Sequence, residues 1–332
     1  MTVIQFYVAA SLLAGQSENE LTSEWERQYT CAKQNYNQRH LELAEQCLQS
    51  ALAAAEKSST QDARLGTTLG TLGLVLLEQG RPKEAEQSIV GAIQAFRRCN
   101  MEACTLGIAR ELRNLAILYT QQNQLLDAER FLLEARRLYS DVGADAVSIA
   151  DIHDSLAWLE LHRHRPAAAE SRFRWALQLV ENAPQADRTR ANLYSGLSAA
   201  LHGRKRDKEA AEAARQALAV AEADTEANPL DIVNHACRLA AASSGVKDYA
   251  LAETSLVRAQ EILAKLPAVE SGEMGQVLTE FGSLRSLQRR YNEAAEFQAR
   301  ALAILGRHLT ADHPQMLALK ENYASTLRKL KR

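Results

Sequence analysis

The chain has 332 residues, of which 46% are apolar and 24% are charged, with 39 basic and 41 acidic residues and a formal net charge of −2. These values are typical of a globular protein and exclude a disordered chain, and the balanced charge argues against a nucleic-acid partner. No run of 18 apolar residues occurs, so we expect no transmembrane segment. With 57 Ala against 15 Gly and 6 Pro, the composition predicts an all-α protein.

The N-terminal 16 residues form a segment of their own, because residues 3–15 are mostly apolar. A secretory signal begins with positive charge, but no Lys or Arg precedes Arg27. A lipoprotein signal would place a cysteine where Gln16 stands. We therefore expect residues 1–16 to pack on the first repeat, and we predict a cytoplasmic location with export as the alternative.

From there to the end of the chain, an alanine recurs at intervals of 41 to 43 residues, and a second alanine follows each one seven residues later. Seven residues are two helical turns, so both alanines of a pair lie on one face of a helix. The first series is Ala44, Ala85, Ala128, Ala169, Ala210, Ala252 and Ala294, and the second is Ala51, Ala92, Ala135, Ala176, Ala217, Ala259 and Ala301.

Another series of small residues stands twelve residues before the first alanine series: Ala32, Gly73, Ala116, Ala157, Ser198, Ala240, Gly282 and, after the last repeat, Ala324. We interpret each repeat as two antiparallel helices that cross at these small residues. Residues 17–332 are therefore predicted to form one repeat array of seven helix pairs. A final basic helix, expected at residues 312–331, would cap the stack.

Proline and glycine agree with this register. Pro82 and Pro166 fall at the expected first turn of a second helix, where the missing N–H has no intrahelical partner to lose. Gly80, Gly203 and Gly245 are expected in the short turn between the two helices of a repeat, as helix-stop residues.

The repeat resembles the tetratricopeptide repeat, whose signature combines bulky, small and aromatic positions on the first helix with an alanine on the second. The third repeat shows the pattern at Leu112, Leu115, Ala116, Tyr119, Ala128, Leu132 and Ala135. The period of about 42 residues exceeds the usual 34, and it resembles the long repeats of kinesin light chains, as in the stretch from Tyr291 through His313 and Pro314 to Ala324. The resemblance implies a right-handed α–α superhelix.

The sequence shows no catalytic motif. It contains no glycine-rich phosphate loop, no zinc-protease pair and no CxxC motif. His162 and His164 are two residues apart at the end of a helix, where they face different directions, so we predict exposed turn residues and no metal site. We accordingly expect no enzyme activity, no catalytic residue and no cofactor.

The five cysteines are an odd number scattered over a long chain, which does not predict a disulfide framework. Cys31 stands at the leucine position of the first repeat and is expected in the core. Cys99 and Cys104 are expected to be buried or idle thiols.

The resemblance also implies that the first helices line the concave face of the stack. In each first helix, the residue three positions before the small residue and the residue one position after it then point into the groove. A further residue, one helical turn later, does the same. The partner-binding residues expected on this basis are Tyr29, Lys33, Tyr36, Arg110, Arg113, Asn114, Asp154, Trp158, His162, His202, Arg238 and Ser286.

Two features of this set favour recognition of a partner. Trp158 could anchor a partner side chain, although packing between helices explains it equally well. Arg110, Arg113 and Asn114 form a donor cluster suited to a carboxylate or phosphate, with an ion pair between Arg113 and Asp154 as the alternative.

A second tryptophan, Trp175, lies next to Ala176 on a second helix and is predicted to belong to the core.

These observations favour a non-catalytic scaffold that binds a protein or peptide, for example one with an acidic group or a free C-terminus, on its concave surface. The alternatives are a peptide-sensing regulatory protein and a rigid assembly spacer that uses its convex face. The oligomeric state stays open.

Overall fold

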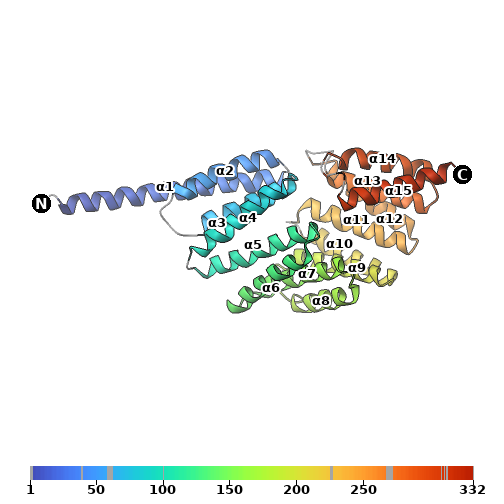
Figure 1. The fold of residues 1–332 in the computed structure, drawn as a ribbon, viewed down its shortest axis with the longest axis horizontal. Helices are drawn as coiled ribbons and strands as arrows, with labels where there is room; N and C mark the ends of the chain where they lie inside the picture. The colour runs from blue at the N-terminus through green and yellow to red at the C-terminus, as the bar shows by residue number, and fades with distance from the viewer. Residues whose placement is uncertain are drawn as a thin grey trace. The chain divides into compact units, whose positions relative to one another are not determined.

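The computed structural model describes residues 3–38, 40–57, 63–99, 101–224, 227–266, 272–307, 309, 311 and 313–331, with side chains from residue 20 onward apart from Pro314. Within these residues the chain forms fifteen α-helices (Figure 1). They are α1 (Val3–Asn37), α2 (Leu41–Lys57), α3 (Arg64–Glu78), α4 (Pro82–Arg97), α5 (Glu102–Gln121), α6 (Leu125–Asp141), α7 (Ala146–His162), α8 (Pro166–Leu179), α9 (Asp187–Gly203), α10 (Asp207–Ala223), α11 (Pro229–Gly245), α12 (Tyr249–Leu263), α13 (Gly272–Leu287), α14 (Tyr291–Leu305) and α15 (Pro314–Leu330).

The helices are grouped in two compact units, Met1–Ala144 with α1 to α6 and Asp145–Arg332 with α7 to α15. Each unit is a stack of helical hairpins, three in unit 1 and four in unit 2, and the single helix α15 follows the last hairpin. The predicted all-α repeat fold of seven helix pairs and a final helix is confirmed.

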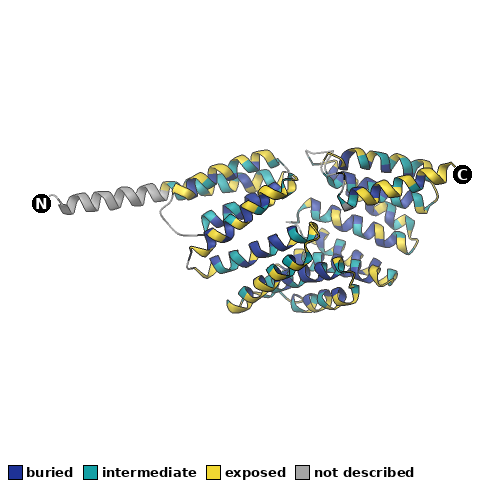
Figure 2. Cartoon of the chain, in the orientation of Figure 1, coloured by how far each residue is buried: buried dark blue, intermediate teal, exposed yellow. Residues whose placement is uncertain are grey.

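The repeated alanines mark the contact between the two helices of each hairpin. All fourteen alanines of the two series have 0% exposed surface. Buried residues recur along the second helix of each hairpin, from α2 to α14 (dark blue in Figure 2). A Cβ added to Gly73 would lie 3.3 Å from the carbonyl oxygen of Ala85, and one added to Gly282 would lie 3.5 Å from that of Ala294. The two backbones therefore approach each other closely at the predicted crossing.

The contacts between hairpins define an inner face for each unit. The backbones of neighbouring first helices pack against one another, whereas in the described part of the chain neighbouring second helices are farther apart and meet through long side chains, as between Arg258 on α12 and Glu222 on α10 at 3.3 Å. A stack with one row of helices close together and the other row spread apart curves toward the close row. Helices α1, α3 and α5 therefore line the inner, concave face of unit 1, and α7, α9, α11 and α13 line that of unit 2.

The turn between the two helices of a hairpin has a fixed left-handed residue. It lies five residues before the first alanine of the repeat and is Gly80, Asn123, His164, Lys205, Lys247 or Arg289. The residue after it donates its N–H back to the first helix, as from Arg206 to the carbonyl of Leu201 at 3.0 Å, which closes a Schellman-type turn. Gly80 takes the predicted place, but Gly203 and Gly245 still belong to their helices, so the prediction is wrong for these two glycines.

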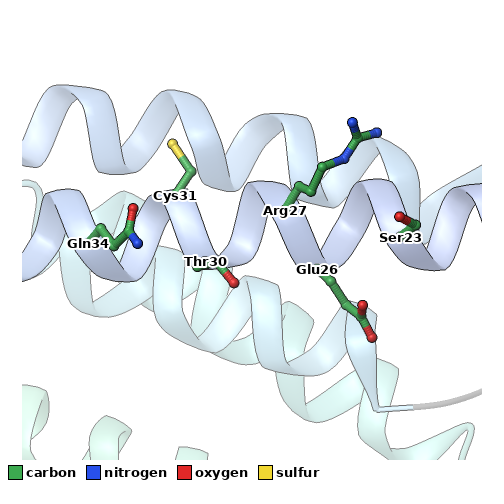
Figure 3. A pocket seen from close by; sticks show the side chains of 6 residues that line it. All are labelled: Ser23, Glu26, Arg27, Thr30, Cys31 and Gln34. Atoms are coloured by element: carbon green, nitrogen blue, oxygen red, sulfur yellow. The ribbon is translucent and has the colours of Figure 1, made fainter.

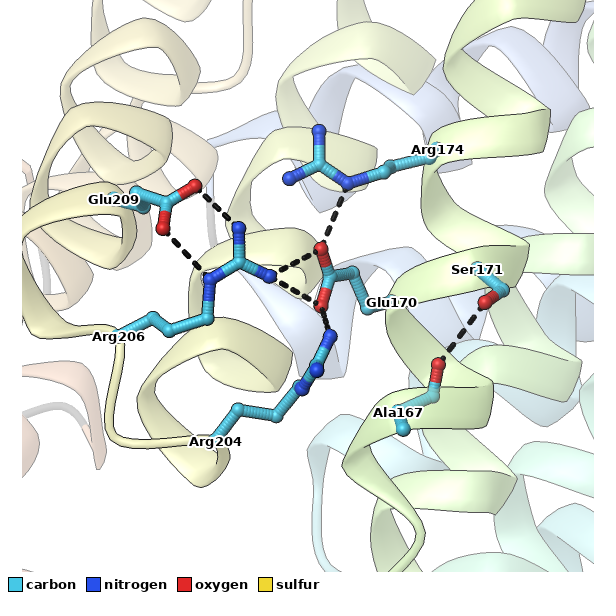
Figure 4. Close-up of polar contacts among 7 residues, drawn as sticks. All are labelled: Ala167, Glu170, Ser171, Arg174, Arg204, Arg206 and Glu209. Atoms are coloured by element: carbon cyan, nitrogen blue, oxygen red, sulfur yellow. Dashed lines mark hydrogen bonds and ion pairs between the residues drawn. The ribbon is translucent and has the colours of Figure 1, made fainter.

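Arginines that follow this turn connect successive repeats. The carboxylate of Glu170 on α8 is 6% exposed and accepts hydrogen bonds from Arg174 on its own helix and from Arg204 and Arg206 in the next repeat (Figure 4). Arg206 Nη1 lies 2.9 and 3.0 Å from the two carboxylate oxygens. Burial alone would raise the pKa of Glu170, but these three arginines lower it below its ordinary value.

Unit 1 contains a similar connection. Arg81, which precedes α4, places Nη1 2.9 Å from both carboxylate oxygens of Glu45 on α2, and it also contacts Glu84 at 2.6 Å. The same arginine position thus joins the second helix of one repeat to the turn of the next repeat in both units.

The final helix ends the stack. Met316 and Leu319 on α15 are buried in the core cluster of unit 2, whereas Leu317, Leu327 and Leu330 are exposed. Ala324, the last member of the small-residue series, is exposed.

The N-terminal predictions concern residues that are only partly described. The expected boundary between residues 16 and 17 falls inside α1, which runs from Val3 to Asn37. The side chains of residues 1–19 lie outside the described part, so the packing of this segment stays a prediction.

The cysteines differ from the expectation. Cys31 on α1 is bonded to Cys47 on α2, and Cys99 is bonded to Cys104 across the turn between α4 and α5. Cys237 is a buried free thiol. The prediction of unpaired core or idle thiols is therefore wrong for Cys31, Cys99 and Cys104, because hairpin formation and the tight turn bring their partners together.

His235 on α11 is a core histidine. It is 4% exposed, and its Nδ1 has no hydrogen-bond partner among the described residues. Burial lowers its pKa to about 4, the nearby charge of Asp231 opposes this shift, and that of Arg238 reinforces it. The folded protein therefore holds this imidazole in its neutral form.

The alanine crossings generate the first prediction. In Ala169→Leu, three added carbon atoms have no space at a helix crossing, so we expect the free energy of unfolding to fall by about 1–3 kcal/mol. The matched control is Ala168→Leu, one residue earlier on the exposed face of α8, which we expect to change stability little. Urea denaturation followed by circular dichroism measures both, and equal effects would contradict the crossing.

The disulfides generate the second prediction. In protein refolded in air and then denatured without reductant, we expect iodoacetamide to label one cysteine of the five, Cys237. Cys31→Ser should raise the number of labelled thiols to two, because it releases Cys47. Mass spectrometry counts the labels, and more than one label on the wild type would show that a pair does not form.

His235 generates the third prediction. Because its pKa is lower in the folded state than the ordinary 6.5, its neutral form stabilises the protein above pH 6.5, and this contribution is lost as the pH falls toward 4. We expect the loss to reach roughly 3 kcal/mol. His235→Gln does not titrate, so its unfolding free energy should fall less over this interval, as measured by denaturation at several pH values. Parallel pH profiles would contradict the assignment.

Candidate functional site

The inner face of unit 1 uses most of its predicted residues to join repeats. The hydroxyl groups of Tyr29 on α1 and Thr71 on α3 lie 2.9 Å apart, and Tyr36 donates to Glu78. Lys33 is exposed between the two tyrosines. The tyrosine rings are partly exposed, so this face offers aromatic surface with its hydroxyl groups already paired.

The predicted donor cluster of α5 holds a carboxylate of the protein itself. Glu111 is 1% exposed, and it accepts a hydrogen bond from Asn114 Nδ2 at 3.0 Å and from Arg110 Nε at 3.1 Å. Gly70 on α3 makes room for it, since a Cβ there would lie 2.4 Å from a Glu111 oxygen. Arg110 and Asn114 thus direct at least one donor each toward the core, and Arg113 is partly exposed beside them.

The remaining predicted residues of unit 2 lie on first helices, at different depths. Asp154 is buried on α7, and His162 is exposed at the end of the same helix. His202 Nδ1 is 2.8 Å from Asp207, and Ser286 contacts Thr326 on α15 at 3.3 Å. Because Arg113 belongs to unit 1 and Asp154 to unit 2, their ion pair stays a prediction.

Trp158 lies on the inner face of unit 2 with its indole partly exposed. Phe173 on α8 packs against it edge to face, with ring centroids 6.0 Å apart. The guanidinium of Arg238 on α11 lies over the indole, 5.6 Å from its centroid. One side of the indole therefore packs against its own hairpin, as one of the two interpretations predicts, and the role of Trp158 as a partner anchor stays a prediction.

Glu280 on α13 completes this region and was missed in the sequence. It stands two residues before Gly282, the same register position that Arg238 occupies before Ala240. This shared position was the signal that could have identified it. The charges of Arg238 and Glu280 act on each other, and burial raises the pKa of the Glu280 carboxyl and lowers that of the Arg238 guanidinium.

Trp175 was predicted wrongly. It is 45% exposed on α8, and its ring lies 4.1 Å from that of His153 on α7. The alanine next to it faces the crossing, and one residue of helix rotation turns the tryptophan about 100° away from that face.

Hollows elsewhere on the surface give weaker candidates. One of about 370 Å³ is lined by six residues that all come from α1, with Cys31 pointing toward the neighbouring helix (Figure 3). Another of about 550 Å³ lies between α8, α9 and α10 and contains Arg174 and Arg190, which already contact Glu170 and Asp187. Arg27, in the first hollow, also has a carboxylate partner, Glu24 on the same helix, so neither hollow offers an unpaired arginine.

Metal ions and membranes would require other features. Across the described ranges, no group of three or more His, Cys, Asp or Glu side chains is arranged to hold a metal ion. None of the described helices has the length and apolar character needed to cross a membrane.

Comparison with known proteins agrees with the repeat geometry. Two tetratricopeptide-repeat family models match residues 107–182 and 278–315. A comparison with the curated proteins gives no match.

Among solved structures, the Rap conjugation gene regulator of plasmid pLS20, in complex with the Phr* peptide, is 14% identical with a TM-score of 0.65, covering 91% of this chain and 77% of its own. A Rap protein complexed with competence and sporulation factor is 12% identical with a TM-score of 0.64, covering 94% and 87%. Kinesin light chain TPR-like repeats from Podosopora anserina are 14% identical with a TM-score of 0.46, covering 59% and 93%.

At these identities the solved structures show the fold alone, and the two Rap proteins support an α-helical repeat solenoid. Over residues 107–182 and 278–315, the family models confirm the type of repeat that the sequence resembles. The chain contains tetratricopeptide repeats, and their long period resembles that of kinesin light chain repeats.

Proposed function

We propose that this protein is a non-catalytic interaction scaffold that binds a peptide or protein segment on the concave face of its first helices. The observation that carries the proposal is the inner face of unit 2, where the partly exposed Trp158 carries the Arg238 guanidinium over its ring. Tryptophan and arginine are enriched among the residues that dominate binding energy at interfaces. Two solved structures with similar folds, both Rap proteins, were determined with a peptide or factor bound.

A peptide-sensing regulatory protein is the second candidate, and the same two structures favour it. It would use the same concave face and differ only in the response that binding triggers. A rigid spacer that uses its convex face is the third candidate, for which the exposed Trp175 on α8 provides an aromatic contact.

The cysteines bear on the location of the protein. Disulfides persist in oxidising compartments and are rare in the cytosol. The sequence predicts a cytoplasmic location, and retention of both disulfides in the protein isolated from its natural cells would favour export instead.

A peptide-binding experiment tests the proposed face. Immobilised wild-type protein is screened against a library of synthetic peptides, beside the triple variant Arg113→Glu, Trp158→Ala and Arg238→Glu. We expect the triple variant to bind the selected peptides at least about 30-fold more weakly, because a tryptophan anchor of this type contributes about 2 kcal/mol.

The matched control carries the same substitutions on second helices: Arg137→Glu, Trp175→Ala and Arg215→Glu. These residues are exposed on α6, α8 and α10. We expect the control to bind as the wild type does. Loss of binding in the control and not in the first variant would assign recognition to the convex face, and equal binding by all three proteins would reject the concave site.

A further inference from the structure

The concave face of unit 2 brings together residues from repeats that are not adjacent in the chain. Trp158 lies on α7 and Arg238 on α11, with the first helix α9 between them in the order of the stack. At the positions that correspond to Arg238 and Trp158, α9 carries the small residues Gly196 and Ala199. The Arg238 side chain reaches past α9 to the indole of Trp158, where its guanidinium lies 5.6 Å from the ring centroid.

Arg238 and Glu280 are charged groups without a hydrogen-bond or ion-pair partner among the described residues. Among the described residues, neither side chain has a hydrogen bond, and no ion pair within 4.0 Å joins them to each other or to a third residue. Arg238 contacts the face of Trp158, and that contact leaves its N–H groups free to donate within the plane of the guanidinium.

Both side chains keep part of their surface accessible, yet the surrounding helices exclude much of the water. Burial disfavours the charged form of each, lowering the pKa of Arg238 and raising that of Glu280. Two buried carboxylates of this chain receive close donors, since Glu111 is bonded to Asn114 and Arg110, and Glu170 is bonded to three arginines. Arg238 and Glu280 have no partner of this kind among the described residues.

We propose that Trp158, Arg238 and Glu280 form a two-charge subsite that binds an extended peptide through one acidic and one basic side chain. The acidic group forms charge-assisted hydrogen bonds with Arg238 beside the indole, and the basic group pairs with Glu280. This inference rests on the proposed function and adds to it the chemistry of the partner.

The arrangement of the helices favours an extended chain over a small molecule. The three residues come from α7, α11 and α13, and neighbouring packed helices lie roughly 8–10 Å apart. An extended peptide advances about 3.3 Å per residue, so a segment of several residues can cross these helices and present two side chains to them.

The test is a positional scan of synthetic nonapeptides in which one position at a time is fixed as Asp, Lys or Ala. We expect wild-type protein to select Asp at one position and Lys at another, each at least about tenfold over Ala. Arg238→Gln should remove the selection for Asp and keep that for Lys, and Glu280→Gln should do the reverse. Arg238→Lys keeps the charge and should retain the preference for Asp.

Two further variants separate binding from structure. The charge swap Arg238→Glu with Glu280→Arg should exchange the positions at which Asp and Lys are selected, which loss of folding cannot produce. The control is Arg215→Gln with Glu212→Gln, a matched Arg and Glu pair exposed on the second helix α10. We expect it to leave the selection unchanged, and circular dichroism confirms the fold of every variant.

The outcomes distinguish this inference from the proposed function. If the wild type selects peptides but Arg238→Gln and Glu280→Gln select the same residues at the same positions, the two-charge subsite is wrong and the concave scaffold stands. If the wild type selects no peptide, the proposed function fails and the subsite fails with it. Selection that changes as described in the two single variants and is exchanged in the charge swap supports both.

Discussion

The close approach of two helix backbones inside each repeat determines the rest of this structure. A small residue on the first helix meets an alanine on the second, and at Gly73 and Gly282 the space for a side chain is bounded by the carbonyl oxygen of the partner helix. Because all fourteen alanines are fully buried, every hairpin crosses at the same place. The crossing fixes which side of the first helix faces its partner, and therefore which side remains for the concave surface.

The concave surface then follows from how the hairpins stack. Within the described residues, the backbones of neighbouring first helices pack together and those of neighbouring second helices do not, so some polar groups on the first helices join neighbouring repeats and others face the concavity. Tyr29 and Thr71, one repeat apart, illustrate the first case. Arg238, whose guanidinium lies over the indole of Trp158, illustrates the second.

The sequence predicted the features that depend on one residue type at one spacing. The alanine period, the prolines at the start of α4 and α8, and the final helix are of this kind, since only small residues fit the crossing and proline fits a first turn. The left-handed turn residue was missed at Lys205 and Arg289, because glycine is favoured there but not required. The cysteine pairs, the exposure of Trp175 and the role of Glu280 depend on side-chain direction across helices, which spacing alone does not give.

The placement of charge separates the structural parts of the repeat from the part available for binding. Arginines after the hairpin turn, Arg81 and Arg206, neutralise a carboxylate of the preceding repeat and hold the outer helices in register. A poorly solvated charge without such a partner is unfavourable. The charges of Arg238 and Glu280 act on each other without a hydrogen bond between them, and the proposed peptide would supply each with an opposite charge at contact distance.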